Sequence, residues 1–266
     1  MRFSNFHQHT TFSDGKNTPE EVVKSAIERG MEAIGFSDHS HTKIDESYCM
    51  MPERYEAYFA EIARLKEAYK EDIRIYTGLE LDYFSACDRS RYDYIIGSVH
   101  YMYEHGVCHP IDHSLAQQKT YLETECGGDR LTFAKNYYDQ LARHIEKNRP
   151  DIVGHFDVIT KFSLFDEDDP AYRSIACEAM ERILPVTRVF EMNTGAISRR
   201  VKDTPYPAPA LLRHLLAHGG EIILGADSHA SDTVDCYFPA CIEILKGIGF
   251  DHIVTFDSGR MREVEI

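Results

Sequence analysis

The chain has 266 residues, of which 43% are hydrophobic, and its formal net charge is −15. This length is typical of one (β/α) barrel, and the apolar content is sufficient for a full core, so long disordered segments are not expected. The acidic balance disfavours a nucleic-acid partner, which would need a basic face, and no apolar run approaches the ~20 residues of a membrane helix.

The first expected strand covers residues 3–6, and a helix follows from Thr18 onward. Thr18 can cap this helix, Pro19 suits its first position, and Glu21 completes a capping box. Apolar residues then recur on one face until Gly30, which can end the helix. The chain therefore begins as a strand–helix unit.

The same alternation continues to the end of the chain. Strands are predicted at residues 33–37, 73–79, 94–99, 152–155, 189–192, 222–226 and 252–256, and helices at residues 55–69, 131–147, 172–184, 210–218 and 238–246. Residues 101–128 are polar and contain several Gly and Pro breaks, so we expect a long functional loop there. Seven or eight short apolar strands that alternate with helices predict a parallel sheet, closed into a single-domain α/β barrel.

Side chains that can bind metals stand where these strands end. They are His7, His9, His39, Glu80, His100, His155, Asp227 and His229, with Asp14 in the turn before the first helix and Asp38 beside His39. Alternation along a strand places His7 and His9 on the same side, and the spacing of Asp227 and His229 repeats this pattern. Because the carboxyl ends of barrel strands form one rim, we expect these ligands to converge around several divalent ions and to support hydrolytic chemistry.

The other histidines do not share this position. Those on predicted helices are expected on solvated faces, and those in the polar stretch are expected at the surface, with substrate contact as an alternative. The two sets are His144, His214 and His218, and His105, His109 and His113.

The cysteine count and the N-terminal residues bear on the cellular compartment. Seven cysteines without a Cys-x-x-Cys motif argue against a disulfide framework or a structural zinc knuckle. The first residues begin directly as a strand and lack the apolar segment of a signal peptide. We therefore expect a cytoplasmic protein with reduced thiols, and the sequence does not indicate an oligomeric state.

Taken in order, the strand-end residues resemble those of the PHP (polymerase and histidinol phosphatase) superfamily. The motifs are His7-Gln8-His9 with Asp14, Asp38-His39, Glu80 with His100, and Asp227-Ser228-His229, while His155 falls where the family has a further ligand. The resemblance spans residues 1 to about 230. It implies a distorted (β/α)7 barrel, with residues 1–266 forming a single PHP-like metal-dependent phosphatase domain.

The resemblance also implies how the metals are bound. Up to three divalent ions (Zn, Mn or Fe) are expected in such a barrel. By family analogy, one ion is bound by His7, His9, Glu80 and Asp227, a second by Glu80, His100 and His155, and a third by Asp14, His39 and His229. In this partition Glu80 bridges two ions.

Within the superfamily, the chain is most similar to the histidinol-phosphate phosphatases of histidine biosynthesis. The features that carry this similarity are the length, the long stretch after His100, and residues 191–195 (Glu-Met-Asn-Thr-Gly) followed by two arginines. In such enzymes an arginine after this segment contacts phosphate, and here Arg199 and Arg200 remain alternatives, with Lys161 as a further candidate. The implied partner is a small phosphorylated metabolite, L-histidinol phosphate, with Asp166 and Glu167 as candidate contacts to its amine and imidazole.

This resemblance gives a hypothesis for catalysis. Three divalent ions outweigh the charge of Asp14, Glu80 and Asp227, and the surplus favours a phosphate dianion. A hydroxide that bridges two metals would attack phosphorus in line, and Asp227, His229 or metal-bound water would protonate the departing alkoxide.

Three alternatives remain at this point. A PHP-type site could act on another small phosphorylated metabolite, on a nucleotide or on DNA ends. A metal-dependent amidohydrolase uses a similar cluster, but it usually needs a lysine at a strand end, and no lysine here ends a strand. A catalytically inactive metal-binding domain is the third alternative, although such domains tend to lose ligands.

Overall fold

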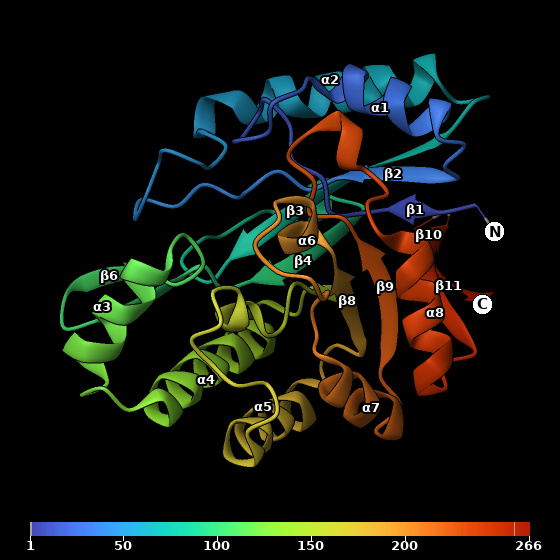
Figure 1. Ribbon diagram of the computed structural model, residues 1–266. Helices are drawn as coiled ribbons and strands as arrows, with labels where there is room; N and C mark the ends of the chain where they lie inside the picture. The colour runs from blue at the N-terminus through green and yellow to red at the C-terminus, as the bar shows by residue number, and fades with distance from the viewer. Residues whose placement is uncertain (1, 258) are drawn as a thin grey trace.

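A computed structural model describes residues 2–257 and 259–266, and its central feature is a curled sheet (Figure 1). Seven parallel strands follow one another in the order β1 (Ser4–Asn5), β2 (Ala33–Phe36), β3 (Arg74–Asp82), β4 (Tyr94–Ser98), β7 (Ile152–Val153), β8 (Val189–Asn193) and β9 (Glu221–Gly225). The ring closes beyond β1 and β9, where Gln8 and Ser228 form a parallel bridge. The predicted seven-stranded, distorted barrel is therefore confirmed.

Helices surround this sheet (Figure 1). They are α1 (Pro19–Glu28), α2 (Tyr55–Ala68), α4 (Arg130–Asn148), α5 (Pro170–Ile183), α7 (Pro209–Ala217) and α8 (Phe238–Ile248), with a short α6 (Gly195–Ser198) directly after β8. The capping box predicted for α1 is confirmed, because Thr18 Oγ1 accepts from Glu21 N and Glu21 Oε2 accepts from Thr18 N at 2.8 Å. Within the described residues, none of the helices combines the length and the apolar character needed to cross a membrane.

The interior of the barrel beneath the strand ends is filled by aromatic side chains. The Phe6 ring packs edge-on against Tyr94, with 5.6 Å between centroids, and Phe256 lies 5.9 Å from Tyr94. Gly35 and Gly78 leave room for the Tyr94 ring, because a Cβ atom at either position would overlap it. The polar residues at the strand ends therefore stand above an apolar floor.

The prediction of a long loop over residues 101–128 was wrong. This segment forms a hairpin of β5 (Tyr101–Glu104) and β6 (Val107–Pro110), followed by helix α3 (Leu115–Glu125). The two turn residues, His105 and Gly106, have φ angles of 49° and 86°, and two positive φ angles are what a two-residue hairpin of type I′ requires. Ser114 caps α3 by accepting from Gln117 N.

The C-terminal strands extend the sheet beyond the seven-stranded ring. The predicted strand β10 (His252–Asp257) pairs in parallel with β9 through Val254 and Ile223. An unpredicted strand, β11 (Arg260–Glu265), then pairs antiparallel with β10. This pair carries Phe256 into the apolar floor.

Candidate metal centre

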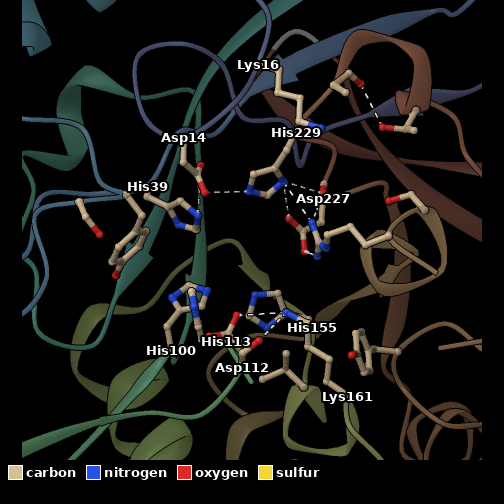
Figure 2. Close-up of a pocket in the computed structure, with 18 of the residues that line it drawn as sticks. Asp14, Lys16, His39, His100, Asp112, His113, His155, Lys161, Asp227 and His229 are labelled. Carbon is tan, nitrogen blue, oxygen red and sulfur yellow. Dashed lines mark hydrogen bonds and ion pairs between the residues drawn. The ribbon is translucent and has the colours of Figure 1, made fainter. Parts of the chain in front are cut away.

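The strand-end residues converge on one cavity of about 700 Å³. Six of them line it directly: Asp14, His39, His100, His155, Asp227 and His229 (Figure 2). His7, His9 and Glu80 lie behind them and are almost fully buried. The parallel barrel brings these residues together, since they lie at or after the carboxyl ends of six parallel strands, β1, β2, β3, β4, β7 and β9, at the same edge of the sheet.

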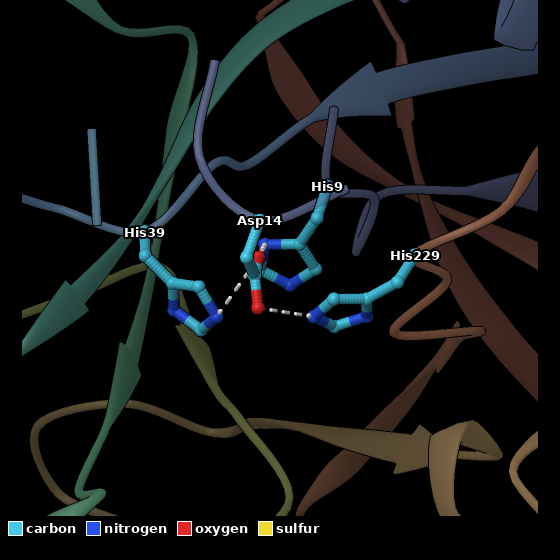
Figure 3. A group of neighbouring side chains, drawn as sticks. All are labelled: His9, Asp14, His39 and His229. Atoms are coloured by element: carbon cyan, nitrogen blue, oxygen red, sulfur yellow. Dashed lines mark ion pairs between the residues drawn. The ribbon is translucent and has the colours of Figure 1, made fainter. Parts of the chain in front are cut away.

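One donor group contains His9, Asp14, His39 and His229 (Figure 3). The Asp14 carboxylate lies 3.2 Å from His229 Nε2, 3.8 Å from His39 Nε2 and 3.9 Å from His9 Nδ1. The His9 ring stacks against both other imidazoles, at 4.2 Å from each centroid. One ligand atom from each of the four residues lies within 4.8 Å of the others, a spacing that suits a single divalent ion.

A second donor group contains His7, His9 and Glu80. Glu80 Oε2 lies 3.3 Å from His7 Nε2 and 3.6 Å from His9 Nε2. Asp227 is adjacent, because its Oδ1 lies 3.4 Å from the same His9 nitrogen and 3.9 Å from His7 Nε2. His9 therefore presents one ring nitrogen to each of the first two groups.

A third donor group contains His39, Glu80 and His100. Glu80 Oε2 lies 2.8 Å from His39 Nδ1, while its Oε1 lies 3.3 Å from His100 Nε2 and 3.0 Å from His155 Nε2. With its contacts to His7 and His9 of the second group included, the two carboxylate oxygens of Glu80 lie near five imidazoles. This carboxylate lies at the centre of the cluster and can bridge two ions.

Several buried polar atoms of the cluster are left without hydrogen bonds. Among the described residues, His7 Nε2, both ring nitrogens of His9 and Glu80 Oε2 have no hydrogen-bond partner. Burying such atoms without a partner is costly, and a divalent cation would engage their lone pairs. The residues present therefore fit bound metal ions.

The ionisation states of two proposed ligands, His9 and Asp227, suit metal binding. Burial, with a further contribution from His39 and His229, lowers the pKa of His9 to about 3, so this imidazole is neutral at pH 7. Burial alone would raise the pKa of the Asp227 carboxyl, but Arg199 and His7 outweigh it and hold that pKa well below its ordinary value. Metal ligands must be deprotonated, and these two are.

Two buried carboxylates orient the histidines from behind. Glu191 Oε1 lies 2.7 Å from His7 Nδ1, and its Oε2 accepts from His155 N at 3.0 Å. Asp82 Oδ2 lies 3.2 Å from His100 Nδ1. A carboxylate on the far nitrogen fixes the tautomer of a metal-binding histidine.

The sequence analysis did not assign either carboxylate to the site. The signal was the alternation along a strand, since Asp82 follows Glu80 by two residues and therefore shares its side of β3. For Glu191 the corresponding feature is a glycine, Gly225, on the neighbouring strand β9. A Cβ atom at that position would overlap Glu191 Oε1.

The Glu191→Gln substitution should weaken metal binding without unfolding the protein. The amide keeps the shape of the side chain but removes the negative charge that faces His7 Nδ1, so we expect a loss of about 10- to 100-fold in metal affinity or turnover. Metal content per chain and kcat, measured beside Glu243→Gln on the exposed side of α8, would test this. Unchanged metal content and kcat would show that Glu191 has no orienting role.

The three candidate phosphate contacts occupy different positions. Arg199 lines the cavity, and its guanidinium donates to the Asp227 carbonyl oxygen at 3.1 Å and to Asp227 Oδ2 at 3.0 Å. Lys161 also lines the cavity and donates to the Asp112 carbonyl oxygen at 2.6 Å. Arg200 is not among the described residues of the cavity wall. The structure thus separates the two arginines that the sequence left as alternatives.

Residues around the centre also depart from expectation. Asp38 faces the loop before α1, where it accepts from Thr10 N at 2.9 Å and Ser13 N at 3.0 Å. His144 was predicted on a solvated face, but it is fully buried and donates from Nε2 to the Leu81 carbonyl oxygen at 2.8 Å. His109 was expected at the surface but is buried, whereas His113 is exposed as expected and also lines the cavity.

Comparisons with known proteins agree with this geometry. The family model described as the PHP domain matches residues 5–195. The probable histidinol-phosphatase of Deinococcus radiodurans is 27% identical over 96% of this chain and 97% of its own length. The histidinol-phosphatase of Lactococcus lactis is 24% identical over 96% of this chain and 95% of its own length.

A solved structure shares the fold. The histidinol phosphate phosphatase of Lactococcus lactis, complexed with Zn, L-histidinol and phosphate, superposes with a TM-score of 0.73. The match covers 98% of this chain and 99% of that chain, at 21% sequence identity.

Proposed function

Since this chain belongs to the PHP domain family, we propose that it is a metal-dependent phosphomonoesterase that hydrolyses L-histidinol phosphate to L-histidinol and phosphate. The observation that carries the proposal is the convergence of six histidines and three carboxylates, around Glu80, on a cavity that also contains Arg199 and Lys161. Its relatives are named histidinol-phosphatases over nearly the full length of both chains. The activity would belong to histidine biosynthesis in the cytoplasm.

We infer that the three donor groups hold up to three divalent ions, Zn, Mn or Fe. The proposed ligands are those named from the sequence: His7, His9, Asp14, His39, Glu80, His100, His155, Asp227 and His229. When bound, such ions supply positive charge toward a phosphate group and lower the pKa of a water molecule to near neutrality. The contact between His39 Nδ1 and Glu80 suggests one change to the family partition, namely that His39 is shared between two groups.

The protein's own cations would hold the phosphate. Arg199 is anchored by Asp227 and also has Nη1 3.1 Å from His229 Nδ1, which aims the guanidinium at the edge of the metal cluster. Lys161 lines the same cavity, where its Nζ lies 3.6 Å from Asp112 Oδ2 (Figure 2). A phosphate bound between them would lie against the proposed ligands, and charge stabilisation of this kind is the main requirement of phosphoryl transfer.

Of the two protein groups considered as proton donor to the departing alkoxide, Asp227 is the less suitable. Its pKa lies well below the ordinary value because Arg199 and His7 outweigh the effect of burial, so it carries no proton at neutral pH. His229, the other protein group, is itself a proposed ligand, and Arg199 Nη1 lies 3.1 Å from its Nδ1. Asp227 and Glu80 would then act as ionised ligands.

The remaining cavity wall suits a cationic, aromatic alcohol. Asp45 and Asp112 present carboxylates, and Tyr48 and Tyr101 stack with their centroids 6.0 Å apart. Carboxylates match the ammonium group of histidinol, and the tyrosine rings match its planar imidazole. Glu167, a candidate for this role from the sequence, instead pairs with Lys202.

A substrate panel tests the proposed function. Chelator-treated protein is supplied with Zn or Mn, and kcat/KM is measured for L-histidinol phosphate, nucleoside monophosphates, other small phosphomonoesters and bis-p-nitrophenyl phosphate. We expect L-histidinol phosphate to exceed each of the others by at least about tenfold, since unpaired buried polar groups penalise poorly matched substrates. A higher kcat/KM for a nucleotide or for the diester, or full activity without metal, would overturn the proposal.

Arg199→Ala should mainly raise KM. Loss of one charge-assisted contact to phosphate removes about 1.5–3 kcal/mol, which corresponds to a roughly 10- to 100-fold weaker substrate affinity. Arg200→Ala is the matched control and should leave KM near the wild-type value. The assignment of phosphate binding to Arg199 would be wrong if the two variants behaved alike.

A further inference from the structure

A second cluster of metal-binding side chains lies outside the cavity, where α5 packs against α7. It contains Glu181 on α5, His214 on α7, and His218, which is the C-cap of α7. One ligand atom from each lies within 4.8 Å of the other two. We refer to these three residues as the α5–α7 cluster.

The α5–α7 cluster lies at the opposite end of the barrel from the proposed catalytic metals. Helices α5 and α7 run back along the outside of the sheet and lead into β8 and β9, so their C-terminal ends lie near the amino-terminal ends of those strands (Figure 1). His218 stands only three residues before β9 begins at Glu221. The cluster is therefore separate from the candidate metal centre.

The two imidazoles and the carboxylate point toward one another. His214 and His218 are one helical turn apart, and their rings stack with 4.1 Å between centroids and 29° between planes. Glu181 Oε1 lies 3.1 Å from His214 Nε2 and 3.8 Å from His218 Nε2. Three donor atoms from two helices thus face a common point.

The hydrogen bonding of the rings leaves lone pairs available. His218 Nδ1 lies 2.8 Å from the His214 carbonyl oxygen, which can only accept, so Nδ1 carries the proton and Nε2 of the neutral ring carries the lone pair. His214 Nε2 is buried and, within the described residues, has no hydrogen-bond partner despite the nearby carboxylate. A backbone carbonyl on the far nitrogen is the usual support of a metal-binding histidine.

We propose that Glu181, His214 and His218 bind one divalent transition-metal ion that ties the end of α7 to α5. Two imidazole nitrogens and one carboxylate oxygen suit Zn²⁺, and also Co²⁺, Ni²⁺ or Cu²⁺, better than Mg²⁺ or Ca²⁺. Three protein ligands leave one tetrahedral position for water. Because the ion binds the folded arrangement of both helices, its effect would be on stability and not on the chemistry of the cavity.

Zinc stoichiometry tests the proposal. The metal-loaded protein is equilibrated with Zn²⁺, and bound zinc per chain is measured for the wild type and for His218→Ala, Glu181→Gln and His252→Ala. His252 is the matched control, because its ring lies 2.6 Å from the Asp251 carboxylate but is not part of the α5–α7 cluster. Wild type and His252→Ala should bind one more zinc ion than His218→Ala or Glu181→Gln.

Two further measurements distinguish a bound metal ion from a simple ion pair at the α5–α7 cluster. Added zinc should raise the Tm of the wild type and of His252→Ala, but by less for the two cluster variants, while phosphatase activity of all four stays the same. Anomalous diffraction from zinc-soaked crystals should give a peak between the three side chains. Equal zinc stoichiometry in all four proteins, or no anomalous peak at this position, would mean that the cluster is only an ion pair.

Discussion

Replacing Glu80 by glutamine is expected to strip metal from the cavity and to lower kcat/KM for L-histidinol phosphate by more than about 100-fold, beyond the loss typical of residues that only orient a ligand. The carboxylate offers two ionised oxygens, one within 3.3 Å of His100 and His155 and the other within 2.8 Å of His39. Burial alone would raise the pKa of Glu80, but the imidazoles led by His7 hold it well below its ordinary value. Glutamine has one oxygen and no charge, so it cannot bridge two ions. Bound metal per chain and steady-state kinetics would measure both effects.

The control for this prediction is Glu71→Gln, which makes the same chemical change at an exposed position after α2. Circular dichroism of both variants would establish that the isosteric change at Glu80 leaves the barrel folded. If the Glu80→Gln protein kept the metal content and turnover of the wild type, Glu80 would not be the central ligand of the proposed site.

Much of this site could be predicted from the sequence because the carboxyl ends of the strands of a parallel barrel meet at one rim. His7 and Asp227 are far apart in the chain, yet each ends a parallel strand, and the bridge between Gln8 and Ser228 closes the ring beside them. The sequence shows which metal-binding residues stand at each strand end, and the barrel fold brings these residues together. Which nitrogen faces which carboxylate is not visible, since it depends on rotamers and on contacts such as His39 Nδ1 to Glu80.

The residues that orient the ligands were harder to find. Asp82 and Glu191 are not among the proposed ligands. Strand alternation places Asp82 on the same side as Glu80, but otherwise the only sequence signal is the cost of burying a carboxylate in a strand. Their partners, His100 and His7, follow other strands, β4 and β1. Each carboxylate and its histidine partner come together only in the three-dimensional structure.

The local structure that the sequence missed has weak hydrophobic periodicity. The β5–β6 turn uses His105 at a position where Asn or Asp is the usual signal, and Tyr103 and Val107 beside it are exposed. Helix α3 buries only Gln118, Tyr121 and Leu122, which is too narrow a stripe to predict a helix. Edge strand β11 is mostly exposed, so its residues show no buried face.

Asp227 combines an unusual backbone conformation with contacts to a proposed metal ligand and to Arg199. Its φ angle is 45°, in the left-handed region that few residues other than Gly, Asn and Asp adopt. Gly195 leaves room for its pairing with Arg199, because a Cβ atom there would lie 2.6 Å from both Arg199 Nη2 and Asp227 Oδ2. In this backbone conformation the Asp227 carboxylate faces both His9 and Arg199, the proposed phosphate contact.

The Asp227→Asn substitution should therefore lower kcat by more than about 100-fold, the range seen when one charge-stabilising group is removed. Asparagine tolerates the left-handed backbone, so the change is confined to the charge that faces His9 Nε2 at 3.4 Å and Arg199 Nη2 at 3.0 Å. Loss of the Arg199 anchor should raise KM as well. Metal content, kcat and KM would be measured beside Asp232→Asn, a carboxylate that lines the same cavity but is not among the nine proposed ligands.

The pH dependence of kcat distinguishes a ligand from a proton donor at Asp227. A general acid loses its proton as the pH rises through its pKa, and the rate then falls. The pKa of Asp227 lies well below its ordinary value, because Arg199 and His7 outweigh burial, so its ionisation is complete long before neutral pH. Any decrease in rate on the alkaline side should therefore persist in the residual activity of Asp227→Asn. If that decrease disappears in the variant, Asp227 donates a proton and its assignment as an ionised ligand is wrong.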